Sequence, residues 1–330
     1  MAVRVRTGAR LHLGFRNLSL ARERLYGGLG VALDAPGMVV TAERASAVTC
    51  DHPDAAVFAR TACEELDVAG VRVQVERALP RHVGLGSGTQ LACAVLAAIG
   101  RAYGRDPDVR ALAPALGRGG RSGVGVATFE GGGFVLDAGH PTARFTTDRP
   151  PRGAWSVPAV AVRRPVPTAW RFVLVRPDVA PGRSDDEEDA GMRSVVKSAG
   201  AEIADEVDRV VVERLLPALA EDDVAAFGRA AETIGRLNGA WYAGEQGGVF
   251  RPPVDGIVDV LGDASAVYGT GQSSWGPTVY AVTDADHADE AVAAGEAALD
   301  AVDETGTVQV VTPRNRGATI EPMDGGHETG

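Results

Sequence analysis

A glycine-rich turn from Pro80 to Gln90 is the part of the sequence best suited to chemistry. Glycines permit a sharp turn and let backbone N–H groups come close to an anion. A strand-like alternation precedes the turn and an alanine- and leucine-rich helix pattern follows it, so the positive end of a helix dipole adds to the site. We predict that the turn binds substrate phosphates through Gly84, Leu85, Gly86, Ser87, Gly88, Thr89 and Gln90.

The turn differs from two common nucleotide-binding fingerprints. It lacks the Gly-Lys-Ser/Thr ending of a P-loop, and it has neither the GxGxxG spacing nor the downstream acid of a dinucleotide site. A tight turn needed only for packing is the alternative, because a short glycine motif alone is a weak signal.

Periodicity predicts the elements around this turn. In the first half we expect strands over 3–13, 31–33, 39–47 and 71–78, helices over 54–66, 90–103 and 110–116, and a hairpin formed by 126–129 and 133–136. Proline and arginine are dense over 141–167, so we divide the chain into domains 1–165 and 166–330. The second half is expected to hold strands over 172–175, 267–268, 278–282 and 307–311, and helices over 195–219, 224–237 and 286–299, with a mobile tail after Arg314.

Composition limits the possible partners. The 330 residues carry a formal net charge of -11, which argues against nucleic acid as a partner. The three cysteines, Cys50, Cys63 and Cys93, have no paired or metal-type spacing. The N-terminus has no apolar signal region, and the longest apolar stretch is too short to span a bilayer. We therefore expect a cytoplasmic protein that binds neither nucleic acid nor membrane.

The motifs taken together resemble the archaeal β-ribofuranosylaminobenzene 5'-phosphate synthase family of the GHMP kinase superfamily. The turn is similar to the second motif of the superfamily, and residues 269–277 are similar to its C-terminal glycine motif. The resemblance to the narrower family also includes residues 10–15, 27–30, 117–125, 132–140 and 273–277. It implies an α+β, GHMP-kinase-like fold with an N-terminal part like ribosomal protein S5 domain 2 and a ferredoxin-like C-terminal part, and it suggests a homodimer.

Two positions depart from the kinases that the chain resembles. Those kinases usually read Gly-Leu-Gly-Ser-Ser, with the second serine near magnesium, and here that position is Gly88. They often carry Ser-Gly-x-Asp, whose aspartate acts as a base or charge partner for the substrate hydroxyl. Here that aspartate is replaced by Gly125. Glycine accepts no proton, so the departures favour a synthase over phosphoryl transfer.

The resemblance implies a condensation of phosphoribosyl pyrophosphate with 4-aminobenzoate or 4-hydroxybenzoate, on the way to methanopterin. A ring carbon attacks C1 of the ribose, and pyrophosphate and CO2 leave. Loss of CO2 replaces loss of a ring proton, so no strong general base is obligatory. Positioning and electrostatics should dominate the catalysis, with Mg2+ bridging the pyrophosphate.

Four residues are our candidates for the catalytic centre. Arg118 and Arg121 could hold the 5'-phosphate or the carboxylate by paired hydrogen bonds. Asp137 is a candidate magnesium ligand or stabiliser of the ribosyl cation, and His140 could hydrogen-bond the substrate. Surface arginines, a turn aspartate and a structural histidine are the alternatives.

Further substrate contacts are expected from three other segments. Arg10 and His12 lie two residues apart in a strand and so share one face. Trp275 could stack on the aromatic acid, with a buried core tryptophan as the alternative. The full set of these candidates is Arg10, His12, His82, Ser273, Ser274 and Trp275.

Two other functions stay open on the sequence alone. One is an ATP-dependent small-molecule kinase, since a shared fold does not settle the chemistry. The other is a non-catalytic metabolite-binding protein that kept the glycine loop.

Overall fold

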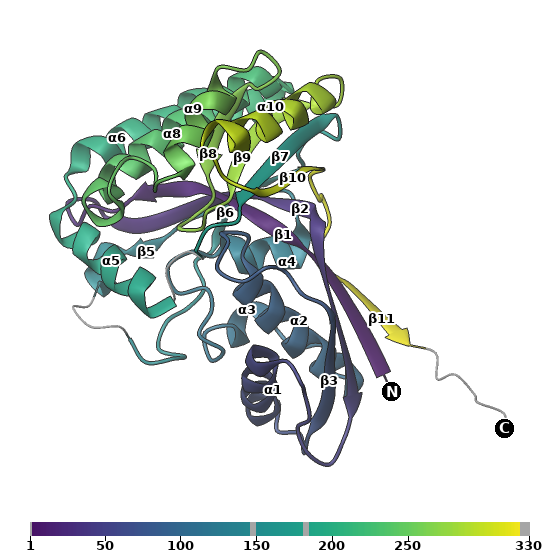
Figure 1. Cartoon of the computed structure of the whole chain (residues 1–330). Helices are drawn as coiled ribbons and strands as arrows, with labels where there is room; N and C mark the ends of the chain where they lie inside the picture. Colours follow the sequence, from purple (N-terminus) through teal and green to yellow (C-terminus); the bar gives the residue numbers. More distant parts are fainter. Residues whose placement is uncertain (1, 146–149, 181–184, 324–330) are drawn as a thin grey trace.

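The protein is described by a computed structural model over residues 2–145, 150–180 and 185–323, and it contains two antiparallel sheets (Figure 1). The larger sheet has the order β11-β1-β2-β4-β6, with β3 and β5 also paired to β2. Its strands are β1 (Ala2–Asn17), β2 (Arg24–Arg44), β3 (Val71–Arg77), β4 (Phe134–Asp137), β5 (His140–Pro141), β6 (Val160–Arg164) and β11 (Thr319–Met323).

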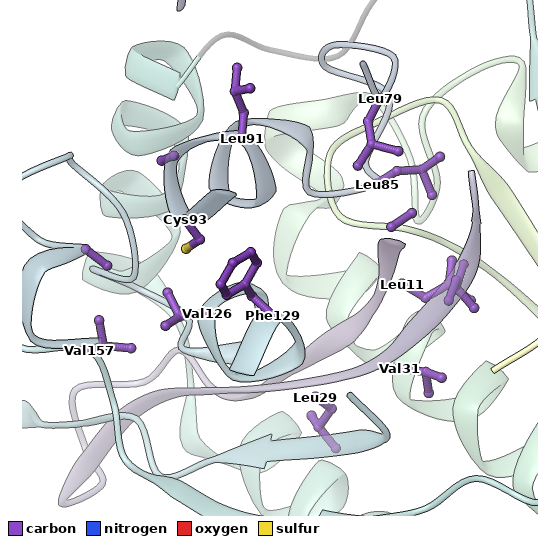
Figure 2. Packing of buried hydrophobic residues seen from close by; sticks show 14 of the residues in the cluster. Leu11, Leu29, Val31, Leu79, Leu85, Leu91, Cys93, Val126, Phe129 and Val157 are labelled. Carbon is purple, nitrogen blue, oxygen red and sulfur yellow. The ribbon is translucent and has the colours of Figure 1, made fainter. Parts of the chain in front are cut away.

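Four helices pack near one face of this sheet, on the side away from the C-terminal helices (Figure 1). They are α1 (Pro53–Glu65), α2 (Ser87–Ala102), α3 (Val109–Leu112) and α4 (Val124–Gly131), and a 3-10 turn follows at Thr142–Arg144. Figure 2 shows Cys93 of α2 beside Val126 and Phe129 of α4, and Leu91 on the opposite side of α2; all four belong to one buried core. Burial of α2 among these neighbours fixes the direction of its N-terminus, which is the end nearest the glycine loop.

The C-terminal sheet has the order β10-β7-β9-β8. Its strands are β7 (Trp170–Pro177), β8 (Gly269–Gln272), β9 (Val279–Asp284) and β10 (Gly306–Val311), and the helices α8 (Val224–Gln246), α9 (Val254–Gly262) and α10 (Ala288–Ala301) complete a βαββαβ succession. Between β7 and α8 lie α5 (Asp185–Ser198), α6 (Ala201–Val210), a π-helical turn (Val211–Leu215) and α7 (Leu216–Glu221). The strand order and succession confirm the predicted ferredoxin-like part.

The predicted hairpin at 126–129 and 133–136 is wrong in its first arm, which is helix α4. A short apolar run does not reveal by periodicity whether it is a buried strand or a buried helix. Here the helix satisfies its own backbone groups in a segment where Val124 and Val126 are fully buried. Only the second arm forms a strand, β4.

Other boundaries also differ from the expectations. The strands predicted over 31–33 and 39–47 are one long strand, β2, and the helix expected over 110–116 shortens to α3. The helix expected over 195–219 is broken into several pieces at the residues given above. The strand expected over 267–268 is β8, displaced to 269–272, because its glycines allow close packing against α8: a Cβ on Gly269 would lie 2.1 Å from the carbonyl oxygen of Gly228.

The mobile tail expected after Arg314 is wrong for residues 315–323, which include the strand β11, and the rest of that tail lies outside the described residues. Arg314 is 8% exposed, and its Nη1 donates to Oδ1 of Asp34 at 2.9 Å. Beyond it, β11 pairs with β1 at the edge of the N-terminal sheet. The end of the chain thus returns to the sheet built by the N-terminal half.

Candidate active site

The glycine loop joins β3 to α2 and is held by both halves of the chain. Gly84 has φ +90°, and a Cβ there would lie 2.1 Å from the carbonyl oxygen of Ser273, so glycine is required on both counts. The carbonyl oxygen of Gly84 accepts hydrogen bonds from Nη1 of Arg10 and from Oγ of Ser273, each at 2.8 Å. The loop is thus fixed before any ligand arrives.

The N-terminus of α2 presents unpaired amides at this loop. Gly86 is the N-cap residue, with φ 77° and no side-chain cap. The amide of Gln90 donates to the carbonyl oxygen of Gly86, while in the described part of the chain the amides of Ser87, Gly88 and Thr89 donate to no protein acceptor. The first N–H groups of an α-helix have no carbonyl partner within the helix, so these amides can bind an anion.

A cavity of about 1180 Å³ lies over these amides. Within the described lining, Asp54 is the one carboxylate, and it is paired with Arg81, with 3.1 Å between Oδ2 and Nη2. Seven arginines share the lining: Arg10, Arg81, Arg118, Arg121, Arg144, Arg152 and Arg193. Such concentrated positive charge in a chain of net charge -11 indicates a polyanionic ligand.

Two loop glycines make room for two of these arginines. A Cβ on Gly86 would lie 2.9 Å from Cγ of Arg10, and a Cβ on Gly88 would lie 2.9 Å from Nη1 of Arg118. The Arg118 guanidinium also lies over the Phe58 ring, 5.2 Å from its centre, which holds it in place by a cation–π contact. The side chains of Arg10 and Arg118 therefore lie close against the backbone of the loop at Gly86 and Gly88.

Asp137 is buried beneath the cavity and does not line it. Its Oδ2 accepts from the amide of Gly123 at 2.7 Å and from Oγ of Ser122 at 3.3 Å, and its Oδ1 accepts from the amide of Gly139 at 2.8 Å. Burial raises the pKa of this carboxyl, while the backbone donors oppose the rise. Both oxygens are used internally, so the placement does not suit the predicted magnesium ligand; Asp137 positions the segment before α4.

We expect Asp137→Asn to destabilise the fold by about 1–3 kcal/mol, because the new amide nitrogen faces backbone donors and leaves one of them buried without an acceptor. Urea unfolding measures the loss. Asp106→Asn is the matched control, since the Asp106 side chain is 75% exposed in its ion pair with Arg101. If Asp137→Asn were as stable as that control, the buried hydrogen bonds of Asp137 would contribute nothing to the free energy of unfolding.

His12 lies at the point where three motifs meet. Its backbone amide donates to Oγ of Ser273 at 3.1 Å, and its Nε2 lies 3.2 Å from Oγ of Ser122. The ring is 4% exposed and lines the cavity. Burial first, and then the charges of Arg10 and Arg121, lower the pKa of His12 well below 6.5.

The lowered pKa of His12 predicts a specific loss of stability in acid. The unfolded chain takes up this proton near pH 6.5 while the folded chain does not, so stability falls as pH drops below that value. We expect the denaturation midpoint of the wild type to fall more steeply below pH 6.5 than that of His12→Phe. Parallel curves for the two proteins would contradict a neutral His12.

The other predicted residues fall into two groups. The first group lines the cavity and consists of His82, Arg121, His140, Ser274 and Trp275. Nε2 of His140 lies 2.6 Å from the carbonyl oxygen of Gly120, so this histidine holds the segment that carries Arg118 and Arg121. Burial lowers the pKa of His140. Leu85 and Gln90 point away from the cavity: Leu85 belongs to the core, and the Gln90 amide bonds to Oγ1 of Thr7 and the carbonyl of Gly125.

Sequence reasoning missed several residues of the lining. Arg144, Arg152 and Trp155 come from the proline- and arginine-rich segment over 141–167, and Arg193 comes from α5. The density of arginines in that segment is the one feature of the sequence that could have indicated a contribution to an anion-binding site. It was not decisive, because arginines in a linker are ordinarily solvent-exposed.

The described residues do not form a protein-held magnesium site. No cluster of three or more His, Cys, Asp or Glu with metal-binding geometry occurs in the described ranges. Mg2+ usually binds carboxylates together with substrate phosphates, and the described lining offers only Asp54, already paired.

Two family models match the chain: the GHMP kinases N terminal domain over residues 54–133, and the GHMP kinases C terminal over residues 215–301. Solved structures share the fold at low identity. A homoserine kinase from Cytophaga hutchinsonii has a TM-score of 0.68 at 20% identity, covering 97% of each chain. A mevalonate pyrophosphate decarboxylase from Streptococcus pyogenes has a TM-score of 0.69 at 9% identity, covering 96% of this chain and 97% of that one.

Curated relatives are more similar in sequence. The β-ribofuranosylphenol 5'-phosphate synthase of Methanothermobacter thermautotrophicus is 31% identical over 95% of this chain and 97% of that protein. The protein of the same name from Archaeoglobus fulgidus is 31% identical over 86% of this chain and 88% of that protein. At this identity over nearly its whole length, the chain belongs to the β-ribofuranosylphenol 5'-phosphate synthase family, within the GHMP kinase fold.

Proposed function

We propose that this protein transfers a phosphoribosyl group from phosphoribosyl pyrophosphate to the ring of a para-substituted benzoate, releasing CO2 and pyrophosphate. The relatives are named for a ribofuranosylphenol product, so 4-hydroxybenzoate is the favoured acid and 4-aminobenzoate the alternative. The observation that carries the proposal is the cationic cavity over the unpaired amides of α2.

The charges of the cavity match the changes of charge in this reaction. Pyrophosphate gains negative charge as it leaves, and the amides of Ser87 to Thr89 with Arg10 and Arg118 lie where they would stabilise it. The remaining arginines would hold the 5'-phosphate by charge-assisted hydrogen bonds. The rest of the catalysis comes from placing the ring carbon against C1 of the ribose in a site shielded from water.

A kinase function is disfavoured by what occupies the two departing positions. The Arg118 guanidinium, at the end of a flexible side chain, lies 2.9 Å from where a Cβ at position 88 would stand, so an arginine occupies the place of the kinase serine. At position 125, a Cβ would lie 2.9 Å from Cγ2 of Thr89, so α2 and α4 pack too closely for an aspartate. The kinase groups are replaced by other contacts, which agrees with a different chemistry on the same fold.

The test is release of labelled CO2 from carboxyl-labelled 4-hydroxybenzoate or 4-aminobenzoate. We expect release that depends on phosphoribosyl pyrophosphate and on active protein, with no requirement for ATP. ATP-dependent phosphorylation of a metabolite would replace the proposal with a kinase. Binding of both substrates without turnover would leave a metabolite-binding protein.

We also propose a location, an assembly and a pathway for this protein. None of the helices in the described ranges combines the length and apolar composition needed to cross a bilayer. We propose the cytoplasm, as expected from the sequence, and a homodimer and a step towards methanopterin, as the family likeness implies; magnesium would enter as a counter-ion of the pyrophosphate.

A further inference from the structure

Aromatic side chains gather on the cavity wall around His12. The ring centres of His12 and Phe15 are 4.7 Å apart, and those of Phe15 and Tyr26 are 5.8 Å apart. His12, Phe15 and Trp275 also line one small adjoining cavity of about 40 Å³, so they lie close together. We call His12, Phe15, Tyr26 and Trp275 the aromatic corner; its shape and apolar faces suit a benzoate ring.

A hydrogen-bond chain behind this corner assigns the tautomer of His12. The amide of Val124 donates to Oγ of Ser122 at 3.2 Å, and Oγ of Ser122 donates to Oδ2 of Asp137 at 3.3 Å. Asp137 accepts backbone N–H bonds on both oxygens, as an ionised carboxylate does, and Ser122 is the donor in the contact between these two side chains. The remaining lone pair of the serine oxygen therefore accepts from Nε2 of His12.

A proton on Nε2 leaves Nδ1 of His12 as the lone-pair nitrogen. No hydrogen bond to Nδ1 occurs within the described part of the chain, and the residue lines the cavity. Gly28 makes this arrangement possible, because a Cβ there would lie 2.3 Å from Oγ of Ser122. Asp137 and Ser122 thus act as positioning residues that present a basic nitrogen to the aromatic corner.

We propose that Nδ1 of His12 is the general base that accepts the para-hydroxyl proton of the aromatic acid. This inference rests on the proposed function. As the O–H electrons move into the ring, the carbon bearing the carboxylate forms its bond to C1 of the ribose, and the bond from C1 to the pyrophosphate oxygen breaks.

The product of this step is a cyclohexadienone that still carries the carboxylate. Its bond to CO2 then breaks, the electron pair restores the aromatic ring and the phenolate, and the proton returns from His12 to the oxygen. No oxidant, reductant or other co-reactant is needed. Burial and the nearby Arg10 and Arg121 lower the pKa of His12, so it is neutral at the start and readily returns the proton.

The test compares the wild type with His12→Gln on three substrates: 4-hydroxybenzoate, 3-fluoro-4-hydroxybenzoate and 3,5-difluoro-4-hydroxybenzoate. Fluorine next to the hydroxyl makes it more acidic, so a base becomes progressively less necessary. We expect kcat on 4-hydroxybenzoate to fall by about 10²–10⁴-fold in the variant. The ratio of wild-type to variant kcat should shrink with each added fluorine. Glutamine can still donate to Ser122, which keeps the surrounding contacts.

Ser122→Ala is the second variant. It removes the oxygen that fixes the proton on Nε2 of His12 and leaves the imidazole in place. We expect a smaller fall in kcat with the same dependence on fluorine. A loss that is equal on all three substrates in both variants would make His12 structural and overturn the inference while leaving the synthase intact. Absence of labelled CO2 from the wild type with every substrate would instead overturn the proposed function itself.

Discussion

Gly84→Ala is expected to lower kcat/KM by at least about 10²-fold, since a displacement of about 1 Å at a reacting site costs that much. The added Cβ would lie 2.1 Å from the carbonyl oxygen of Ser273. Because both groups belong to the backbone, the clash can be relieved only if the loop moves. The φ of +90° adds strain of about 1–2 kcal/mol for an L residue. Labelled CO2 release measures the activity, and thermal unfolding measures the stability.

Gly247→Ala is the matched control for this variant. Gly247 ends α8 with φ 86°, and a Cβ there meets nothing within 4 Å. It should show the strain of a left-handed alanine, with kcat/KM unchanged. If Gly84→Ala behaves like this control, the contact between the loop and Ser273 does not hold the phosphate site.

Arg118→Met should reduce kcat by about 10²–10³-fold, which is the usual cost of removing one donor aimed at developing negative charge. Methionine keeps the aliphatic stem and removes the guanidinium together with its contact over Phe58, so the loss reports on the guanidinium. If Arg118 stabilises the leaving pyrophosphate, kcat falls more than the KM for phosphoribosyl pyrophosphate rises.

Arg118→Lys separates charge from geometry, because lysine keeps a point charge and loses the planar fork. We expect activity between those of the wild type and Arg118→Met. Arg72→Met controls for general loss of charge, since its side chain is 70% exposed. Full activity in Arg118→Met would show that Arg118 does not contribute to the phosphate site.

The local parts of the fold followed from the sequence. The glycine loop was found between a strand and a helix because Val71, Val73 and Val75 alternate and residues 90–103 are rich in alanine and leucine. The structure has β3 and α2 there. The ferredoxin-like part came from the resemblance and not from periodicity, because strand order depends on pairing between distant segments.

The composition of the site could be predicted only in part. Arg10, Arg118 and Arg121 were found because they lie in or beside motifs, whereas Arg144 and Arg193 reach the cavity from segments without a motif. Asp137 shows the opposite error. A carboxylate at a strand end is equally suited to binding a ligand and to accepting backbone N–H bonds, and only tertiary packing decides between them.

The most direct test of the account is a crystal structure of the protein with phosphoribosyl pyrophosphate bound. We expect pyrophosphate oxygens within hydrogen-bond distance of the amides of Ser87, Gly88 and Thr89, with the Arg118 guanidinium on the same group and C1 of the ribose turned towards His12. A pyrophosphate bound elsewhere, with these amides facing water, would contradict the central claim that the start of α2 is the phosphate site.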